Sequence, residues 1–408
     1  MSITQVDLQQ SLEKLARLPA RWRRLFRLVL RWLSKPVVAG RTVASSLLHK
    51  RSAAGQAWWS LPKGQRLGVN VIGFVDGEFG LGVMARSLLA DLHAAGIPYR
   101  IVANEVRSQS FVRQEFHEHS CAENFPVNIA VTTLDRWQID AMRLSREVDL
   151  RLPTIGYVAW ELETLPPEFI KTLGLFDEVW GISKFCAGVV CTPIAQAPLC
   201  LPIRVDAPPQ FQPLELAELG LEDLEKDHVF LVGYCFDAAS YVERKNPLAV
   251  LRAFQQAFLQ GEQLAKQPHL ILKTHNTALA GQEPQWQALV RLAALDTRVH
   301  ILDSTQSHAQ TWRLIQTFDC YMSLHRAEGL GLTVGEALAL GKPTVCTAYG
   351  GVMDYANLPG FAGVRYELIP VERGQYVGGA GFVWANPDVN DAAGKLRAVF
   401  DKATNGLI

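Results

Sequence analysis

The sequence predicts an α/β protein with parallel sheets, divided into two consecutive parts. Short apolar segments alternate with amphipathic segments along most of the 408 residues, as expected for repeated strand–helix units. A proline-rich stretch over 202–213 interrupts this alternation, and the same pattern restarts behind it. The length also favours two or three domains over one.

The first α/β part is expected from residue 66 to residue 204. Its first strand is followed by a helix that begins at Gly80 and runs to about residue 95. The alternation continues to the proline-rich stretch, with separate apolar runs of strand length. Strands are expected at 69–75, 98–103, 128–131, 154–159 and 178–182.

The second α/β part is expected from residue 205 to residue 408. Helices are expected between its strands, and a last helix is expected from 389 to about 402. Strands are expected at 229–235, 269–273, 299–302, 320–324 and 344–347.

Residues 1–65 differ from the rest and predict a basic helical extension. Residues 14–51 hold eleven Lys and Arg and no acid. From Arg21 the chain reads RWRRLFRLVLRWL, which places arginines on one helical face and Trp22, Phe26 and Leu33 on the opposite face. Such a helix over 12–35 is typical of peripheral membrane contact, and packing on the protein's own body is the alternative.

Composition argues against several classes of protein. The formal net charge is +0 at pH 7, so bulk charge gives no reason to expect a nucleic-acid partner. Seven cysteines show no metal-binding or paired spacing, which favours a reducing compartment. The chain has no apolar run near twenty residues and no secretory signal pattern, so we expect a cytoplasmic protein. Peripheral contact with the inner face of the plasma membrane would come from the extension.

The stretch over 323–351, SLHRAEGLGLTVGEALALGKPTVCTAYGG, carries the strongest chemical signal. Glu328 and Glu336 stand eight positions apart, and a turn of Gly329, Leu330 and Gly331 lies between them. An apolar strand, a glycine turn and a helix start make an anion site, because the first helical turn leaves N–H groups unpaired. The acid in the loop can reach a sugar, and the acid in the helix can reach a ribose.

Two further motifs follow predicted strands. In FDAASYVERKNP, over 236–247, Arg244 and Lys245 are adjacent cations at the expected start of a helix and can neutralise a diphosphate. In GEFGLGVMAR, over 77–86, Gly80 and Gly82 allow close approach to a phosphate. Dinucleotide binding is the rival interpretation of this loop, but no acid ends the next strand, IPYRIVAN.

Three single residues are weaker candidates. Glu161 ends an apolar strand, where it could bind an acceptor or stabilise charge. Lys273 ends another strand and is a candidate for contact with a nucleotide or its phosphates, with a solvated strand-end lysine as the alternative. His325 precedes the glycine turn, and a structural histidine is favoured there over a proton carrier.

The segment HRAEGLGLTVGEALALGKPTV resembles the E-x7-E signature of the retaining glycosyltransferases of family 4, which have the GT-B fold. RKNP over 244–247 resembles the phosphate-binding Arg/Lys pair of these enzymes, and 77–86 resembles their first-domain glycine loop. The segments 366–371 (YELIPV) and 384–388 (WANPD) are similar to bacterial members that build surface polysaccharides. The resemblance covers roughly residues 69–401.

This resemblance implies two Rossmann-like, doubly wound domains that face a cleft. The domain over 66–204 would lie on the acceptor side, and the domain over 205–408 would bind the nucleotide sugar. Family members commonly end with a helix that crosses back onto the first domain. Here the chain stops six residues after Lys402, which is too few for a further crossing helix. Either the last helix makes the crossing, or the natural protein is shortened, or the chain is a fragment.

The implied activity is transfer of a mannosyl or glucosyl group to a glycan or lipid-linked oligosaccharide acceptor in polysaccharide biosynthesis. GDP-mannose is the first choice of donor and UDP-glucose the second. No D-x-D-like motif stands at a strand end, so we expect no metal and no other cofactor. Attack by the acceptor on the same face is implied, with no protein nucleophile assigned. In addition, the resemblance implies that relatives often place a histidine near the position of Glu161, and this chain has none there.

Roles for single residues follow from the same resemblance. Glu328 would bind donor-sugar hydroxyls, Glu336 would hold the ribose, and the cations with the glycine-loop amides would hold the diphosphate. The catalytic candidates are Glu328, Arg244, Lys245 and Glu161. The donor-binding candidates are Gly80, Gly82, Lys273, Gly329, Leu330, Gly331 and Glu336. A non-catalytic sugar-nucleotide-binding scaffold, a GT-B epimerase and a phosphorylase are the alternatives.

Overall fold

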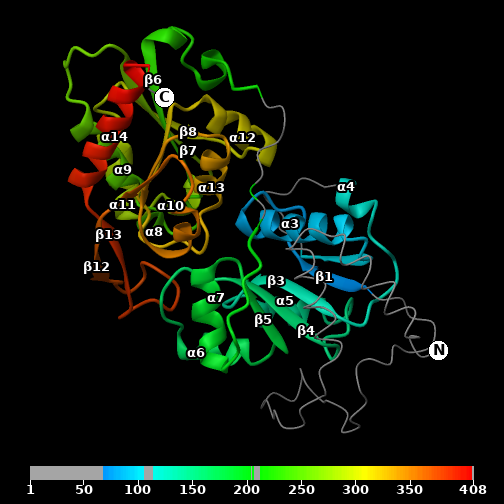
Figure 1. The fold of residues 1–408 in the computed structure, drawn as a ribbon. Helices are drawn as coiled ribbons and strands as arrows, with labels where there is room; N and C mark the ends of the chain where they lie inside the picture. The colour runs from blue at the N-terminus through cyan, green and yellow to red at the C-terminus, as the bar shows by residue number, and fades with distance from the viewer. Residues whose placement is uncertain (1–67, 105–113, 204, 206–211, 407–408) are drawn as a thin grey trace. The chain divides into compact units, whose positions relative to one another are not determined.

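A computed structural model describes residues 68–104, 114–203, 205 and 212–406. Their contacts form two compact units, each with its own parallel sheet (Figure 1). The first unit holds the described residues up to Ala159, with Pro167–Gly181 and Val190–Ile203. The second unit holds Trp160–Pro166, Ile182–Val189 and the described residues from 205 onward. The basic helix predicted within 12–35 lies outside the described residues.

The sheet of the first unit has the strand order β2-β1-β3-β4-β5, and all neighbouring strands are parallel. Every residue of β1 is buried, as expected for a central strand covered on both faces. The strands are β1 (Val69–Gly73), β2 (Tyr99–Ala103), β3 (Asn128–Thr133), β4 (Thr154–Ala159) and β5 (Glu178–Gly181). The helices up to β5 are α3 (Gly80–Ala94), α4 (Gln114–His117), α5 (Trp137–Leu144) and α6 (Pro167–Leu173), and α7 (Lys184–Cys191) follows β5.

The sheet of the second unit has the order β11-β10-β9-β6-β7-β8 and is also parallel. Its strands are β6 (Val229–Cys235), β7 (Gln267–Thr274), β8 (Val299–Asp303), β9 (Cys320–Ser323), β10 (Thr344–Thr347) and β11 (Phe361–Val364). An antiparallel pair, β12 (Tyr366–Pro370) and β13 (Val383–Pro387), forms a separate small sheet.

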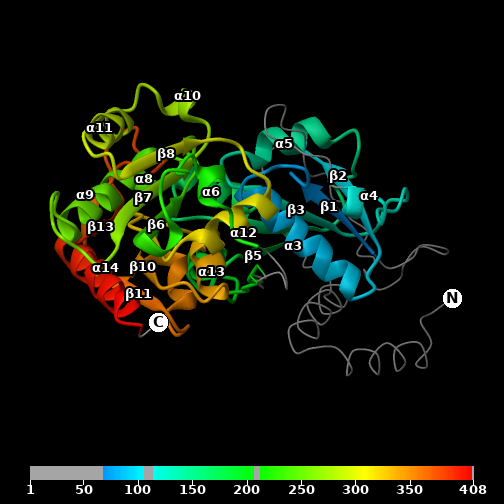
Figure 2. The same ribbon diagram turned by 90° about the horizontal axis from the view of Figure 1, so that it is seen from above.

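Helices cover both faces of the second sheet. Helices α9, α11 and α14 lie along one side, and α12 and α13 lie along the other (Figures 1 and 2). Phe230, Phe258 and Phe400 meet edge to face beneath the first group, with centroids 5.1–6.4 Å apart. This contact anchors α14 on the second unit. The helices are α8 (Val242–Lys245), α9 (Pro247–Ala257), α10 (Thr277–Ala280), α11 (Pro284–Ala293), α12 (His308–Thr317), α13 (Leu332–Ala339) and α14 (Val389–Thr404).

The predicted fold class is confirmed, with two parallel-sheet α/β units. Strands predicted at 154–159, 229–235 and 344–347 have the observed bounds, and the other predicted strands differ by one or two residues at an end. Strand β11 and the β12–β13 pair were not predicted as strands. Strand β12 has no buried residue, so it lacks the continuous apolar run that marked the other strands. Strand β11 is only four residues long, and Val364 is its one buried residue.

Candidate active site

The loops that follow β6 and β9 meet at one edge of the second sheet. These strands are neighbours, although β7 and β8 separate them in the sequence. The strand order therefore reverses between β6 and β9, and such a switch point leaves a crevice at the carboxyl ends of the strands, where ligands of open α/β sheets bind. The loop after β6 carries Arg244 and Lys245, and the loop after β9 carries Glu328.

Hydrogen bonds tie the two loops together. Asn246 adopts a left-handed backbone conformation with φ 52°, and its side chain donates to the carbonyl of Leu324, 2.9 Å away. The amide of Arg326 donates to the carbonyl of Arg244, 2.8 Å away. The two cations lie at the end of the short helix α8, whereas the sequence predicted them at the start of a longer helix. The longer helix, α9, begins two residues after Lys245, at Pro247.

Arg244 is the central residue of the site. Its side chain is 3% exposed, and each guanidinium nitrogen has a protein partner. Nε and Nη2 donate to the carbonyl and hydroxyl oxygens of Ser240, 3.3 and 2.7 Å away, and Nη1 donates to the carbonyl of Ala327, 2.9 Å away. Nη1 also lies 3.4 Å from Glu328 and 3.8 Å from Glu161.

Glu328 lies between two cations. Lys245 donates a hydrogen bond to its Oε1, and Arg244 faces its Oε2. Burial alone would raise the pKa of Glu328, but the two cations outweigh burial and lower the pKa to about 2. The carboxylate is therefore charged at any physiological pH.

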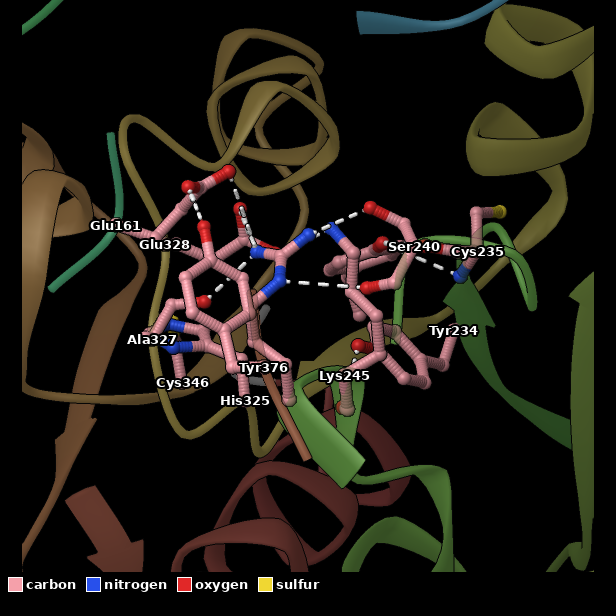
Figure 3. A network of polar contacts seen from close by, with 12 residues as sticks. Glu161, Tyr234, Cys235, Ser240, Lys245, His325, Ala327, Glu328, Cys346 and Tyr376 are labelled. Carbon is pink, nitrogen blue, oxygen red and sulfur yellow. Dashed lines mark hydrogen bonds and ion pairs between the residues drawn. The ribbon is translucent and has the colours of Figure 1, made fainter. Parts of the chain in front are cut away.

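Glu161 joins the same group from the segment after β4. The hydroxyl of Tyr376 donates to its carboxylate, and the Tyr376 ring faces the Arg244 guanidinium with 6.0 Å between guanidinium carbon and centroid (Figure 3). Tyr376 comes from the loop between β12 and β13, and its ring also contacts Trp160 and Tyr241 at centroid distances of 5.6 and 5.0 Å. Burial and the neighbouring Glu161 raise the pKa of Tyr376 far above its usual value.

His325 lies behind this group in the protein interior. Its Nε2 is 3.6 Å from the sulfur of Cys346, and its Nδ1 has no hydrogen-bond partner among the described residues. Burial lowers the pKa of His325 to about 4, although Glu328 acts in the opposite direction. The imidazole is therefore neutral near pH 7, in agreement with the predicted structural role.

Close backbone packing explains the glycines of the turn over 329–331 and the facing glycine at 351. A Cβ on Gly351 would lie 1.9 Å from the carbonyl oxygen of Gly329, so neither loop could approach the other with a side chain there. The amide of Gly351 donates to the carbonyl of Glu328, 2.7 Å away. Gly331 has φ 76° and directly precedes the first residue of α13. Leu330, between Gly329 and Gly331, is buried. The glycines thus fix the backbone that carries Glu328.

Glu336 occupies a different position from Glu328. It lies on α13, is 3% exposed, and its Oε1 is 2.6 Å from Nε2 of His308 at the start of α12. Trp312 also donates to this nitrogen, 3.1 Å away, so the nitrogen faces a donor and a carboxylate at once. The other oxygen of Glu336 has no hydrogen-bond partner among the described residues.

Lys273 is buried at the end of β7, and the alternative of a solvated lysine is wrong. Its ammonium lies 3.4 Å from Nδ1 of His275, whose other nitrogen is 3.6 Å from Asp237. Burial raises the pKa of the nearby Cys235 thiol to about 12, with a lowering effect from Lys273 and a raising effect from Glu336. Lys273 and Glu336 therefore both lie near the carboxyl end of β6.

Gly80 and Gly82 belong to the first unit. A Cβ on Gly82 would lie 1.9 Å from the carbonyl oxygen of Gly77, so the turn itself requires this glycine. Gly80 is exposed at the first position of α3. Arg86 closes the turn by donating to the carbonyls of Val75 and Gly77, each 2.8 Å away.

The sequence analysis missed Tyr376, Ser240 and His308. Ser240 lies four residues before Arg244 in the motif, and a hydroxyl at that spacing was an available signal on a helical turn. Tyr376 approaches Glu161 from 215 residues away, and no local pattern could indicate this contact. His308 meets Glu336 through the packing of α12 on α13, which depends equally on the tertiary structure.

The two parallel-sheet units and the charged group at a switch point define a GT-B glycosyltransferase fold. A family model described as glycosyl transferases group 1 matches residues 238–364, which include Arg244, Glu328 and Glu336. This segment of the chain therefore resembles glycosyl transferases group 1. Sequence comparison with curated proteins finds no match.

Solved structures with the same fold are distant in sequence. A glycosyltransferase from Rickettsia africae is 12% identical, with a TM-score of 0.55, over 83% of this chain and 89% of that chain. The Anabaena HepE protein, solved with UDP and glucose, is 15% identical, with a TM-score of 0.52, over 83% and 91%. A UDP-forming α,α-trehalose-phosphate synthase from Burkholderia xenovorans is 12% identical, with a TM-score of 0.51, over 83% and 93%. These likenesses show the fold, and the family match adds a resemblance to glycosyl transferases over 238–364.

Two searches bear on metals and membranes. Within the described residues, no group of three or more His, Cys, Asp and Glu side chains is arranged to hold a metal ion. Metal independence stays a prediction. None of the helices in the described parts of the chain combines the length and apolar character that a bilayer crossing requires.

Proposed function

We propose that this protein is a retaining glycosyltransferase that moves a mannosyl or glucosyl group from a nucleotide sugar to a glycan or lipid-linked acceptor. The observation that carries the proposal is the group of Arg244, Lys245, Glu328 and Glu161 at the switch point of the second sheet. It lies partly within the glycosyltransferase group 1 domain. GDP-mannose is the first candidate donor and UDP-glucose the second, and polysaccharide biosynthesis is the proposed context.

The proposed chemistry follows from the charges. Departure of the nucleoside diphosphate creates a polyanion and a cationic sugar, and preorganised cations stabilise the polyanion without reorganising at the moment of reaction. Lys245 is the more accessible cation, with 18% of its side chain exposed against 3% for Arg244. Lys245 would therefore meet the diphosphate first, while Arg244 orients Glu328 and adds its charge to the site.

The two acids of the turn would divide the donor between them. Glu328 is fixed by two cations and would orient the sugar by accepting hydrogen bonds from its hydroxyls. Glu336 keeps one oxygen without a hydrogen-bond partner among the described residues, and this oxygen is a suitable acceptor for a ribose hydroxyl. Lys273 and the Gly80–Gly82 loop remain proposed contacts of the diphosphate, and the reaction is proposed to need no metal.

The direct test is a donor screen with the purified protein. Thermal unfolding with GDP, UDP and ADP sugars would identify the donor, because a ligand that binds the folded state stabilises it. Transfer to an acceptor, with the anomeric configuration of the product read by nuclear magnetic resonance, would test the retaining outcome. Binding without hydrolysis or transfer would instead favour a non-catalytic scaffold, and an inverted product would contradict the retaining proposal.

The cellular setting is a separate proposal. All seven cysteines are free, which fits the reducing conditions of the cytoplasm. The basic segment over 12–35 is proposed to contact anionic lipid. A chain that begins near residue 65 should keep its fold and lose binding to vesicles that contain phosphatidylglycerol. Unchanged vesicle binding would contradict the membrane proposal.

A further inference from the structure

The charged group around Arg244 is neutral as a whole, and this affects how it can bind a diphosphate. Arg244 and Lys245 carry two positive charges, Glu161 and Glu328 carry two negative charges, and all four are linked by ion pairs. A nucleoside diphosphate brings at least two further negative charges. If the protein uses a nucleotide sugar, as proposed above, a carboxylate must give way before both cations can face the phosphates.

Glu161 is the carboxylate that is held less strongly by the cations. Glu328 contacts both of them, through a hydrogen bond from Lys245 and a 3.4 Å approach to Arg244. Glu161 contacts Arg244 through one nitrogen at 3.8 Å, and its side chain is 21% exposed against 13% for Glu328. The Coulomb attraction of Glu161 to the site is therefore the weaker of the two, and its loss costs less.

Tyr376 holds Glu161 in this position. Its hydroxyl donates to the carboxylate (Figure 3), and its ring contacts the rings of Trp160 and Tyr241. The hydrogen bond fixes the carboxylate of Glu161 beside the guanidinium of Arg244. Glu161 is thus kept near Arg244 by a neighbour that carries no charge of its own.

We propose that Glu161 competes with the diphosphate for Arg244 and thereby sets the affinity for the nucleotide. Tyr376 is a positioning residue that acts through Glu161. When a donor binds, its phosphates replace the Glu161 carboxylate at Nη1 of Arg244. When the nucleoside diphosphate leaves, the carboxylate returns and favours its release. Glu161 therefore lowers ground-state affinity and speeds product release.

The test is a titration of GDP, UDP and ADP into five forms of the full chain by calorimetry. Glu161→Gln keeps the shape of the side chain and removes its charge, so it should bind the preferred diphosphate about fivefold more tightly or better. Tyr376→Phe should bind it more tightly by a smaller factor. The double variant should bind no more tightly than Glu161→Gln, because both changes act on one carboxylate. Glu372→Gln is the matched control, since it removes an exposed acid from the Tyr376 loop, and its affinity should equal the wild-type value.

Kinetics give a second readout that a merely structural role would not produce. Glu161→Gln should lower KM for the donor and lower kcat together, because tighter product binding slows release. If the wild type binds a diphosphate and both Glu161→Gln and Tyr376→Phe bind it equally or more weakly, this inference is overturned while the proposed function stands. If the wild type binds none of the three diphosphates, the proposed function fails and this inference fails with it. If Glu161→Gln does not fold, Tyr376→Phe tests the inference by itself, because it keeps the packed ring.

Discussion

Each unit has a glycine turn after a strand that borders the switch point of its sheet, β1 in the first unit and β9 in the second, and the two turns differ in the charges around them. In each sheet the strand order reverses beside the first strand, between β1 and β3 or between β6 and β9. Gly82 in the first unit and Gly351 in the second both pack against a carbonyl oxygen that a Cβ would approach to 1.9 Å. The glycines are therefore explained by close backbone packing in both units.

The charged residues distinguish the two turns. In the first unit Arg86 donates to two carbonyls of its own turn and lies 3.7 Å from Glu78. In the second unit Arg244 links two carboxylates from different segments and is joined by Lys245. Glycine spacing thus identifies a tight strand–helix turn, and charge gathered from several loops identifies the candidate site.

Replacing each buried arginine should give the largest effect and test this comparison directly. Arg244→Ala leaves Glu328 and Glu161 without their shared cation, so the unfolding free energy should fall by about 3–5 kcal/mol. The burial of Arg244 makes its loss affect the fold as well as the chemistry. Turnover should also fall by about two orders of magnitude. Chemical denaturation and steady-state kinetics would measure both.

Arg86→Ala in the first unit is the matched control. It should lower stability, because two carbonyls lose a donor, and it should change donor affinity and turnover far less than Arg244→Ala. An equal loss of nucleotide affinity in both variants would show that the first unit's turn belongs to the site. That result would support the predicted role of Gly80 and Gly82.

Replacing Glu328 and Glu336 one at a time should give the next largest effect. Glu328→Gln should lower turnover about 100-fold with little change in nucleoside-diphosphate affinity, because Glu328 faces the proposed sugar position. Glu336→Gln should weaken nucleoside-diphosphate binding about tenfold, because a charged acceptor is lost from the proposed ribose contact. Calorimetry with the free diphosphate and single-turnover kinetics distinguish these outcomes. Equally poor diphosphate binding by both variants would contradict the division of roles.

Most of the fold could be predicted because apolar runs of strand length are a local property. Strand β6, with all seven residues buried, is an example, and its predicted bounds agree with the structure. The β12–β13 pair could not be recognised, because β12 has no buried residue and its pairing depends on a partner across a twelve-residue loop. The order of the strands also depends on contacts that no single segment encodes.

The candidate site could be predicted only in part, for a related reason. Arg244, Lys245 and Glu328 stand in motifs, so their chemistry was visible one segment at a time. Their mutual neutralisation and the burial of Arg244 arise when two loops meet, and sequence suggested an accessible pair of cations instead. Tyr376 stands in no motif, and its contact with Glu161 depends on the position of the loop after β12.

Alanine at the two packed glycines should give a smaller effect that sharpens the comparison. Gly82→Ala and Gly351→Ala should each lower the unfolding free energy by about 1–3 kcal/mol, because the new Cβ forces the backbone apart. Gly351→Ala should reduce turnover more than Gly82→Ala does, since it displaces the loop that carries Glu328. Gly394→Ala is the control, because this exposed position in α14 has no atom near a new Cβ, and it should raise stability by about 0.5 kcal/mol. Equal turnover in the two packed variants would contradict the distinction between the turns.

The last prediction concerns acid and the buried histidine next to the charged group. Burial lowers the pKa of His325 to about 4, so the folded protein keeps the imidazole neutral while the unfolded chain protonates it below its usual value near 6.5. The stability that His325 contributes is therefore complete above pH 6.5 and is lost as pH falls to about 4. This loss amounts to about 3 kcal/mol. His269 behaves in the same way, since burial and then His300 lower its pKa to about 4.

Urea unfolding of the second unit between pH 6.5 and 4.5 would measure this contribution. Glu328 is not involved in that range, because its folded-state pKa of about 2 makes its own contribution disappear only below its usual value near 4.5. His325→Asn should lose stability at pH 7, because it leaves space beside Cys346. Its stability should then depend less steeply on pH than that of the wild type, by about one proton. An unchanged pH dependence of the unfolding free energy would show that His325 takes up protons in the folded state. The inference that its imidazole is neutral in the interior of the second unit would then be wrong.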